Sequence, residues 1–136
     1  MELTMSEATI TERDEQNIIK GINNLLQQLN VDYQNTKEER KAIAAEFPAN
    51  EQEFTVLEEI ELLTVLIRGY GSQIQARGMI DLEQEAVERL AKMRVFELPT
   101  IALLYFDTTS KYPLMKAYLL RLDYLRLLIL EYLQAL

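Results

Sequence analysis

The sequence predicts an all-α fold: a single-domain helical bundle of about five to seven helices with a long apolar C-terminal helix. Hydrophobic residues make up 49% of the chain, whereas the sequence contains only four glycines and three prolines. This composition is unlike that of disordered chains, and it leaves few residues for the turns of β-rich folds. We therefore expect one domain over residues 1–136, with residues 1–10 disordered or frayed.

The first helix is predicted to begin after Thr11 and to run to about Asn30. Thr11 followed by Asp14 resembles a capping arrangement, in which a side-chain oxygen accepts from the first backbone N–H groups. Gly21 weakens this helix by about 1 kcal/mol, which favours a close contact with another helix at that point. Residues 31–35 then read as a connection.

A second, short helix is predicted between Thr36 and Phe47. Thr36 and Glu39 have the T-x-x-E spacing of a capping box, and Pro48 cannot continue a helix. The pattern therefore predicts both ends of this helix.

A third, longer helix is predicted from a cap at Asn50 with Glu53 to Arg77. Gly69-Tyr70-Gly71 interrupts its apolar pattern, and we interpret the two glycines as a kink in one helix rather than a turn. Gly78 is typical of a left-handed helix terminator.

The second half of the chain predicts three further helices. Asp81 with Gln84 begins one, Pro99 opens a short apolar helix over residues 101–106, and Pro113 begins the last one.

The last helix, residues 113–136, carries apolar residues on more than one side. One row has the 4, 3, 4, 3, 4 spacing of a packed helix face: Tyr118, Leu122, Leu125, Ile129, Tyr132 and Leu136. Because four more leucines lie near the opposite side, we expect this helix to be buried or to bind a partner. Arg121 is expected on the buried side, where it needs either an internal acid or another chain. The predicted interface residues are Leu119, Leu120, Arg121, Tyr124, Leu127 and Leu130. A membrane span is disfavoured because residues 117–136 contain four charged side chains.

Negative charge is concentrated in the first half of the chain. Residues 1–68 hold 14 acidic and 6 basic residues, whereas residues 69–136 hold 8 of each, so the net charge of −8 belongs to the first half. Solvated surface explains this pattern, and an acidic face for a basic partner is the alternative. The candidate acidic face consists of Glu46, Glu51, Glu53, Glu58, Glu59 and Glu61.

The composition argues against catalysis. The chain has no histidine and no cysteine, which excludes His-based acid–base chemistry, thiol nucleophiles and the usual zinc sites. Glu58, Glu59 and Glu61 point around a helix in different directions, and Gly69-Tyr70-Gly71 lacks the rest of a phosphate-binding motif. We expect no catalytic residues, no metal and no cofactor.

Two basic clusters could contact phosphate, but acidic residues are interleaved with each. They comprise Lys37, Arg40, Lys41, Arg89, Lys92 and Arg94. Because nucleic-acid binding needs unopposed positive charge, we expect such contacts only within a larger complex.

These observations together predict a cytoplasmic, non-catalytic helical subunit for protein interaction or assembly. Its apolar C-terminal helix would bind a protein partner or a second copy of the chain. One alternative is an acidic antagonist that mimics nucleic acid against a basic protein. Another is a small helical subunit of an RNA-guided antiviral nucleoprotein complex.

Overall fold

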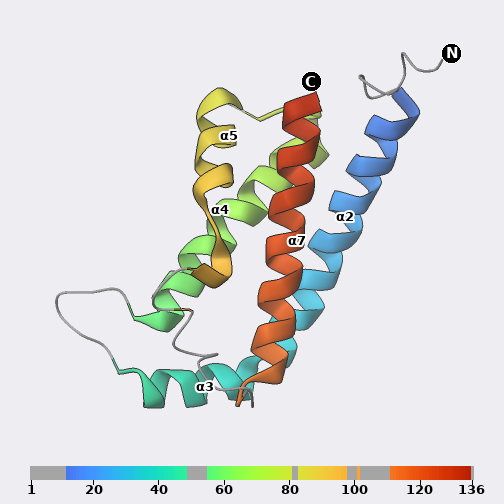
Figure 1. The fold of residues 1–136 in the computed structure, drawn as a ribbon. Coiled ribbons are helices and arrows are strands. Elements are labelled where there is room, and N and C mark those ends of the chain that lie inside the picture. The colour runs from blue at the N-terminus through green and yellow to red at the C-terminus, as the bar shows by residue number, and fades with distance from the viewer. Residues whose placement is uncertain (1–11, 49–54, 81–82, 98–100, 102–110, 136) are drawn as a thin grey trace, which may run out of the picture.

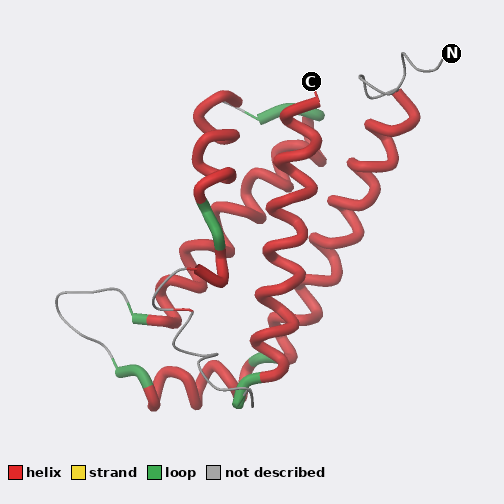
Figure 2. Tube along the Cα trace, in the orientation of Figure 1, coloured by secondary structure: helices red, strands yellow, loops and turns green. Residues whose placement is uncertain are grey.

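The computed structural model describes residues 12–48, 55–80, 83–97, 101 and 111–135, and this part of the chain is all helical, without strands. It contains five α-helices and one short 3₁₀ segment: α2 Glu12–Asn35, α3 Lys37–Glu46, α4 Val56–Arg77, α5 Glu83–Lys92, η1 Val95–Glu97 and α7 Pro113–Ala135. The predicted all-α class is confirmed (Figure 2). Several predictions lie outside the described residues: the frayed segment 1–10, the caps at Thr11, Asn50, Glu53 and Asp81, and most of the helix 101–106.

Helix α7 contacts each of the other four described α-helices. In Figure 1, α5 lies on one side of α7 and α2 on the other, while α3 lies across the end from which α7 begins. The inner side of α7 is therefore enclosed by its own chain.

The core is built from apolar residues that recur at helical spacing on α2, α4 and α7. On α7 the predicted packed row lies inside, because Tyr118, Leu122, Leu125 and Ile129 are all fully buried. The Tyr118 hydroxyl lies 2.9 Å from Oγ1 of Thr64 on α4, so its polar end is satisfied within the core.

Two of the four glycines, Gly21 and Gly71, lie where another helix approaches closely. A Cβ on Gly71 would lie 3.2 Å from Cδ2 of Leu26 on α2. α4 runs through Gly69 and Gly71 as one helix, which confirms that the two glycines do not form a turn between helices; the kink stays a prediction. A Cβ on Gly21 would lie 3.1 Å from Cδ2 of Leu128 on α7. Gly78 ends α4 with φ 72°, in the left-handed conformation that glycine adopts without strain.

The start of α3 differs from the prediction. Residues 31–35 are helical and extend α2 to Asn35, and Thr36 makes no side-chain cap hydrogen bond. Its hydroxyl instead donates to the Tyr33 carbonyl at 2.7 Å and accepts from Nε of Arg40 at 3.0 Å. Because α3 follows α2 after a single residue, little room is left for a separate capping box.

Glu39, the other member of the predicted capping box, caps α7 instead. Its carboxylate accepts from the backbone N–H groups of Leu114 at 3.0 Å and Met115 at 2.7 Å. A carboxylate at this point satisfies unpaired N–H groups and interacts favourably with the helix dipole. The capping box that the structure shows lies at Thr55 and Glu58, where α4 begins.

The C-terminal helix is less apolar than predicted. It is 23 residues long, but Lys116, Arg121, Glu131 and Gln134 are exposed on it. Across the described residues, no helix combines the length and apolar character needed to cross a membrane.

We expect Glu39→Ala to lower the free energy of unfolding by about 1–2 kcal/mol, because two N–H groups of α7 lose a charged acceptor. Glu38 is the matched control: its side chain is 83% exposed and lies 3.6 Å from Lys41. Glu38→Ala should cost less than about 0.5 kcal/mol. Urea denaturation followed by circular dichroism measures both, and equal losses would contradict the capping role.

Candidate interaction surface on α7

Three large apolar side chains form a row along the outer side of α7. Leu120 is 52% exposed, Tyr124 58% and Leu127 47%. Their spacings of 4 and 3 residues keep them on one side of the helix. We call Leu120, Tyr124 and Leu127 the α7 outer stripe.

The structure divides the predicted interface residues between the two sides of α7. Leu119 is fully buried, so its place in an exposed interface was a wrong prediction. It follows Met115 by four residues and precedes Leu122 by three, and both of these face the core. Leu130 is half-buried and lines a shallow hollow with Leu127 at the C-terminal end of the stripe.

Arg121 is exposed rather than buried, which corrects the prediction. Its Nη1 lies 2.7 Å from Oδ2 of Asp32 on α2, and its side chain is 45% exposed. Arg121 therefore has an internal partner at the edge of the α7 outer stripe.

Arg126, which the sequence analysis did not single out, is the buried arginine of this helix. It is 6% exposed, donates from Nη1 to the Leu90 carbonyl at 2.7 Å and from Nε to Asp123 at 2.8 Å. The Leu90 carbonyl belongs to the last turn of α5 and also accepts from the Met93 N–H at 3.2 Å, so Arg126 is its second donor. One signal was available: Arg126 follows Leu119 and Leu122 by seven and four residues, which is core spacing.

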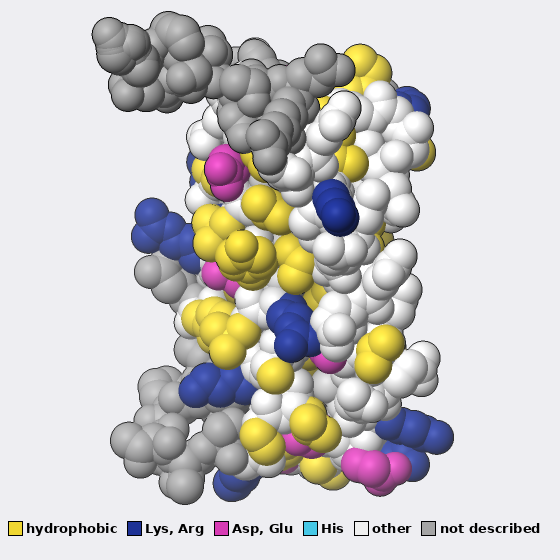
Figure 3. Space-filling model, turned by 90° about the vertical axis from the view of Figure 1, so that its right-hand side faces the viewer, with side chains coloured by type: hydrophobic (Ala, Val, Ile, Leu, Met, Phe, Trp, Pro, Cys, Tyr) yellow, Lys and Arg dark blue, Asp and Glu magenta, His cyan; other side chains and the backbone are white. Residues whose placement is uncertain are grey.

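Every other described helix exposes fewer large apolar side chains than α7 does. Val31 on α2 and Met79 after α4 are single, and α4 exposes Leu62 and Val65. Figure 3 views the side of the molecule where α2 lies and shows hydrophobic side chains in separate groups with basic side chains between them. Scattered exposed apolar residues are normal on soluble domains, so the row on α7 is the stronger candidate.

The basic residues lie on α3, on α5 and, for Arg94, just after α5, and several of them contact other residues of the chain. Arg40 lies 4.0 Å from the ring centroid of Tyr33, and Lys41 lies 3.6 Å from Glu38. Arg89 pairs with Glu85 at 3.1 Å. Lys37, Lys92 and Arg94 are exposed. In Figure 1, α3 and α5 lie at different ends of the molecule, so the six residues do not form one surface.

Two of the four described residues of the candidate acidic face, Glu46 and Glu58, have local roles. Glu46 accepts from the Tyr112 hydroxyl and from Lys111, and Glu58 caps α4. Glu59 is half-buried and Glu61 is exposed on α4, whereas Glu51 and Glu53 lie outside the described residues.

Hydrogen bonds shift the pKa values of these groups. The Tyr112 hydroxyl, followed by Lys111, lowers the pKa of Glu46. In return the Glu46 carboxylate raises the pKa of Tyr112 to about 12. The Thr55 backbone N–H lowers the pKa of Glu58.

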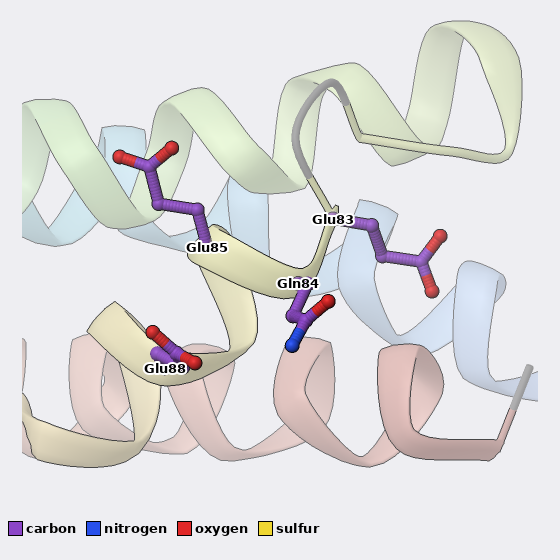
Figure 4. Close-up of a pocket in the computed structure, with 4 residues that line it drawn as sticks. All are labelled: Glu83, Gln84, Glu85 and Glu88. Carbon is purple, nitrogen blue, oxygen red and sulfur yellow. The ribbon is translucent and has the colours of Figure 1, made fainter.

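A second hollow lies at the start of α5 and is lined by Glu83, Gln84, Glu85 and Glu88. Figure 4 shows these side chains pointing in different directions rather than toward a common point. Among the described residues, no group of three or more acidic side chains could hold a metal ion.

No protein-family model, curated protein or solved structure matches this chain. Among the surfaces described above, the α7 outer stripe has the largest row of exposed apolar side chains.

The Glu46–Tyr112 hydrogen bond predicts a pH dependence. The pKa of Tyr112 is higher in the folded state than in the unfolded state. The contribution of Tyr112 to the free energy of unfolding is therefore fully present below pH 10.0, its ordinary pKa, and is lost as the pH rises toward about 12. Because the pKa of Glu46 is lowered, its contribution is lost as pH falls into the acid range.

In Glu46→Gln, we expect the Tyr112 titration midpoint to fall toward 10.0, the value of an unperturbed tyrosine. Carbon-13 NMR of the tyrosine rings measures the midpoint, with Tyr112→Phe to assign the signal. Glu59→Gln is the control and should leave the midpoint unchanged. An unchanged midpoint in Glu46→Gln would contradict the assignment.

Proposed function

We propose that this chain is a helical bundle without catalytic activity, and that it acts as a protein-interaction or assembly subunit through the α7 outer stripe. One observation carries the proposal. Leu120, Tyr124 and Leu127 are about half exposed in one row on a helix whose other side is enclosed by the chain itself. Tyrosine is enriched at the centres of protein interfaces, where its ring is buried and its hydroxyl finds a partner.

The stripe can contribute useful binding free energy. Complete burial of a large apolar side chain is worth about 1.5–3 kcal/mol, so covering the exposed half of each residue gains about 1 kcal/mol. A partner must also cover neighbouring surface, because association itself costs several kcal/mol. The half-buried Leu130 and the shallow hollow beside it extend the apolar surface at one end.

Charges beside the stripe are already neutralised within the chain. Arg121 pairs with Asp32, and Asp123 pairs with Arg126. A partner that covers the stripe would therefore not have to bury either charge without a counter-ion.

The two alternative functions receive less support from these contacts. An acidic antagonist needs carboxylates available to a basic partner, but the carboxylates of Glu46 and Glu58 accept hydrogen bonds within the chain, from Lys111 and from the Thr55 backbone N–H. A nucleoprotein subunit needs cations for phosphate, but Arg40 and Arg89 contact tyrosines and neighbouring polar groups.

The proposal predicts that partner binding depends on the stripe. A tagged chain is recovered from its native source at its natural level, and the proteins bound to it are quantified by mass spectrometry. We expect Leu120→Ser with Leu127→Ser to reduce the specific partner by about tenfold or more, because covered leucines become polar. Circular dichroism should show an intact fold, since exposed substitutions change stability little.

Val65→Ser is the matched control, because Val65 is 69% exposed on a different helix, α4. It should leave the recovered partner unchanged. If the variant with Leu120→Ser and Leu127→Ser recovered as much partner as the wild-type chain, the proposed function would be contradicted.

A further inference from the structure

The outer side of α7 has a nearly symmetric pattern of charge and apolar side chains. Lys116 and Glu131 are both exposed, and they lie beyond the two ends of the α7 outer stripe. At about 100° per residue, all five side chains fall within one sector of the helix. The order along the helix is therefore basic, leucine, tyrosine, leucine, acidic.

The midpoints of this pattern coincide. Lys116 and Glu131 are centred between residues 123 and 124, and so are Leu120 and Leu127. Tyr124 lies half a residue from this centre, which is less than 1 Å along a helix that rises about 1.5 Å per residue. The spacing of these five side chains is therefore nearly the same when it is read from either end of the helix.

Such a pattern is complementary to a second copy that runs in the opposite direction. Antiparallel α7 helices would place Lys116 opposite the partner's Glu131 and Leu120 opposite the partner's Leu127. Tyr124 would lie against the partner's Tyr124. A parallel pair would instead bring like charges together at both ends, which costs binding free energy.

The other charges of this side do not oppose the arrangement. Arg121 and Asp123 flank the centre, and each has an opposite charge within its own chain, Asp32 and Arg126. In a two-fold interface both copies contribute the same residues, so two apolar stripes are buried against each other.

We infer that the partner of the α7 outer stripe is a second copy of this chain, bound with the two α7 helices antiparallel and Tyr124 at the two-fold axis. This inference rests on the proposed function, because it names the partner of the same surface.

Sedimentation equilibrium of the full chain, from about 1 to about 300 micromolar at low salt, tests the self-association. Lys116→Glu and Glu131→Lys should each weaken the dimer by about tenfold, because each change places two like-charged pairs across the interface. The double variant should recover most of the lost affinity, because it restores opposite charges at both ends.

Glu61→Lys is the control, with the same charge change as Glu131→Lys at an exposed position on α4. It should leave the dimer unchanged. A wild-type chain that stays monomeric over the whole range, or a double variant no better than the single ones, would overturn the inference. The proposed function would survive that result if the double leucine variant still lost a different partner.

The orientation has a separate test, which uses the absence of natural cysteine in the chain. Spin labels are attached to Ala117→Cys or Gln134→Cys, both at exposed positions on α7. In the antiparallel dimer, the axial separations of the labelled positions are about 20 Å at residue 117 and about 30 Å at residue 134. Pulsed electron paramagnetic resonance should show a longer label-to-label distance at residue 134 than at residue 117. Similar short distances of about 10 Å at both positions would indicate a parallel pair and overturn the inference.

Discussion

The fold depends on the packing of four helices against the inner side of α7. Besides apolar packing, α7 makes specific hydrogen bonds with its neighbours. Glu39 of α3 caps the beginning of α7, and Arg126 of α7 donates to the Leu90 carbonyl in the last turn of α5. Near its other end, the Tyr132 hydroxyl donates to the Gly78 carbonyl at 2.8 Å, where α4 terminates. Because these groups bind backbone atoms at helix ends, they fix the position of α7 along its neighbours as well as its rotation.

That fixed rotation determines which surface remains for a partner. With Leu119 and Leu122 directed inward, Leu120, Tyr124 and Leu127 are left on the outside. The exposed apolar surface of α7 is smaller than the sequence indicates, because Leu119 is fully buried and Leu130 is half-buried. We therefore expect the proposed interface to be of limited size, with charges at its ends, rather than an obligate one.

Helical periodicity was sufficient to predict the packed row on α7, and the glycines themselves were sufficient to predict the helix terminator at Gly78 and the close helix contact at Gly21. These features depend on residues close together in the sequence. The core spacing of Arg126 was not enough to identify it, rather than Arg121, as the buried arginine, because no local pattern contains the polar partners that a buried arginine needs. Their partners, Asp32 and the Leu90 carbonyl, lie 89 and 36 residues away. The capping role of Glu39 depends on a contact across 75 residues, which no local pattern contains.

α7 is enclosed on its inner side by its own chain, and we propose that a partner covers it only along its outer stripe. Methyl NMR of leucine with a soluble paramagnetic agent measures this directly, in dilute solution and in the bound state. The account predicts strong relaxation of the Leu120 and Leu127 methyl groups when dilute, its loss on binding, and protection of Leu119 and Leu122 in both states. Equal protection of all four leucines when dilute, or unchanged relaxation of Leu120 and Leu127 on binding, would contradict it.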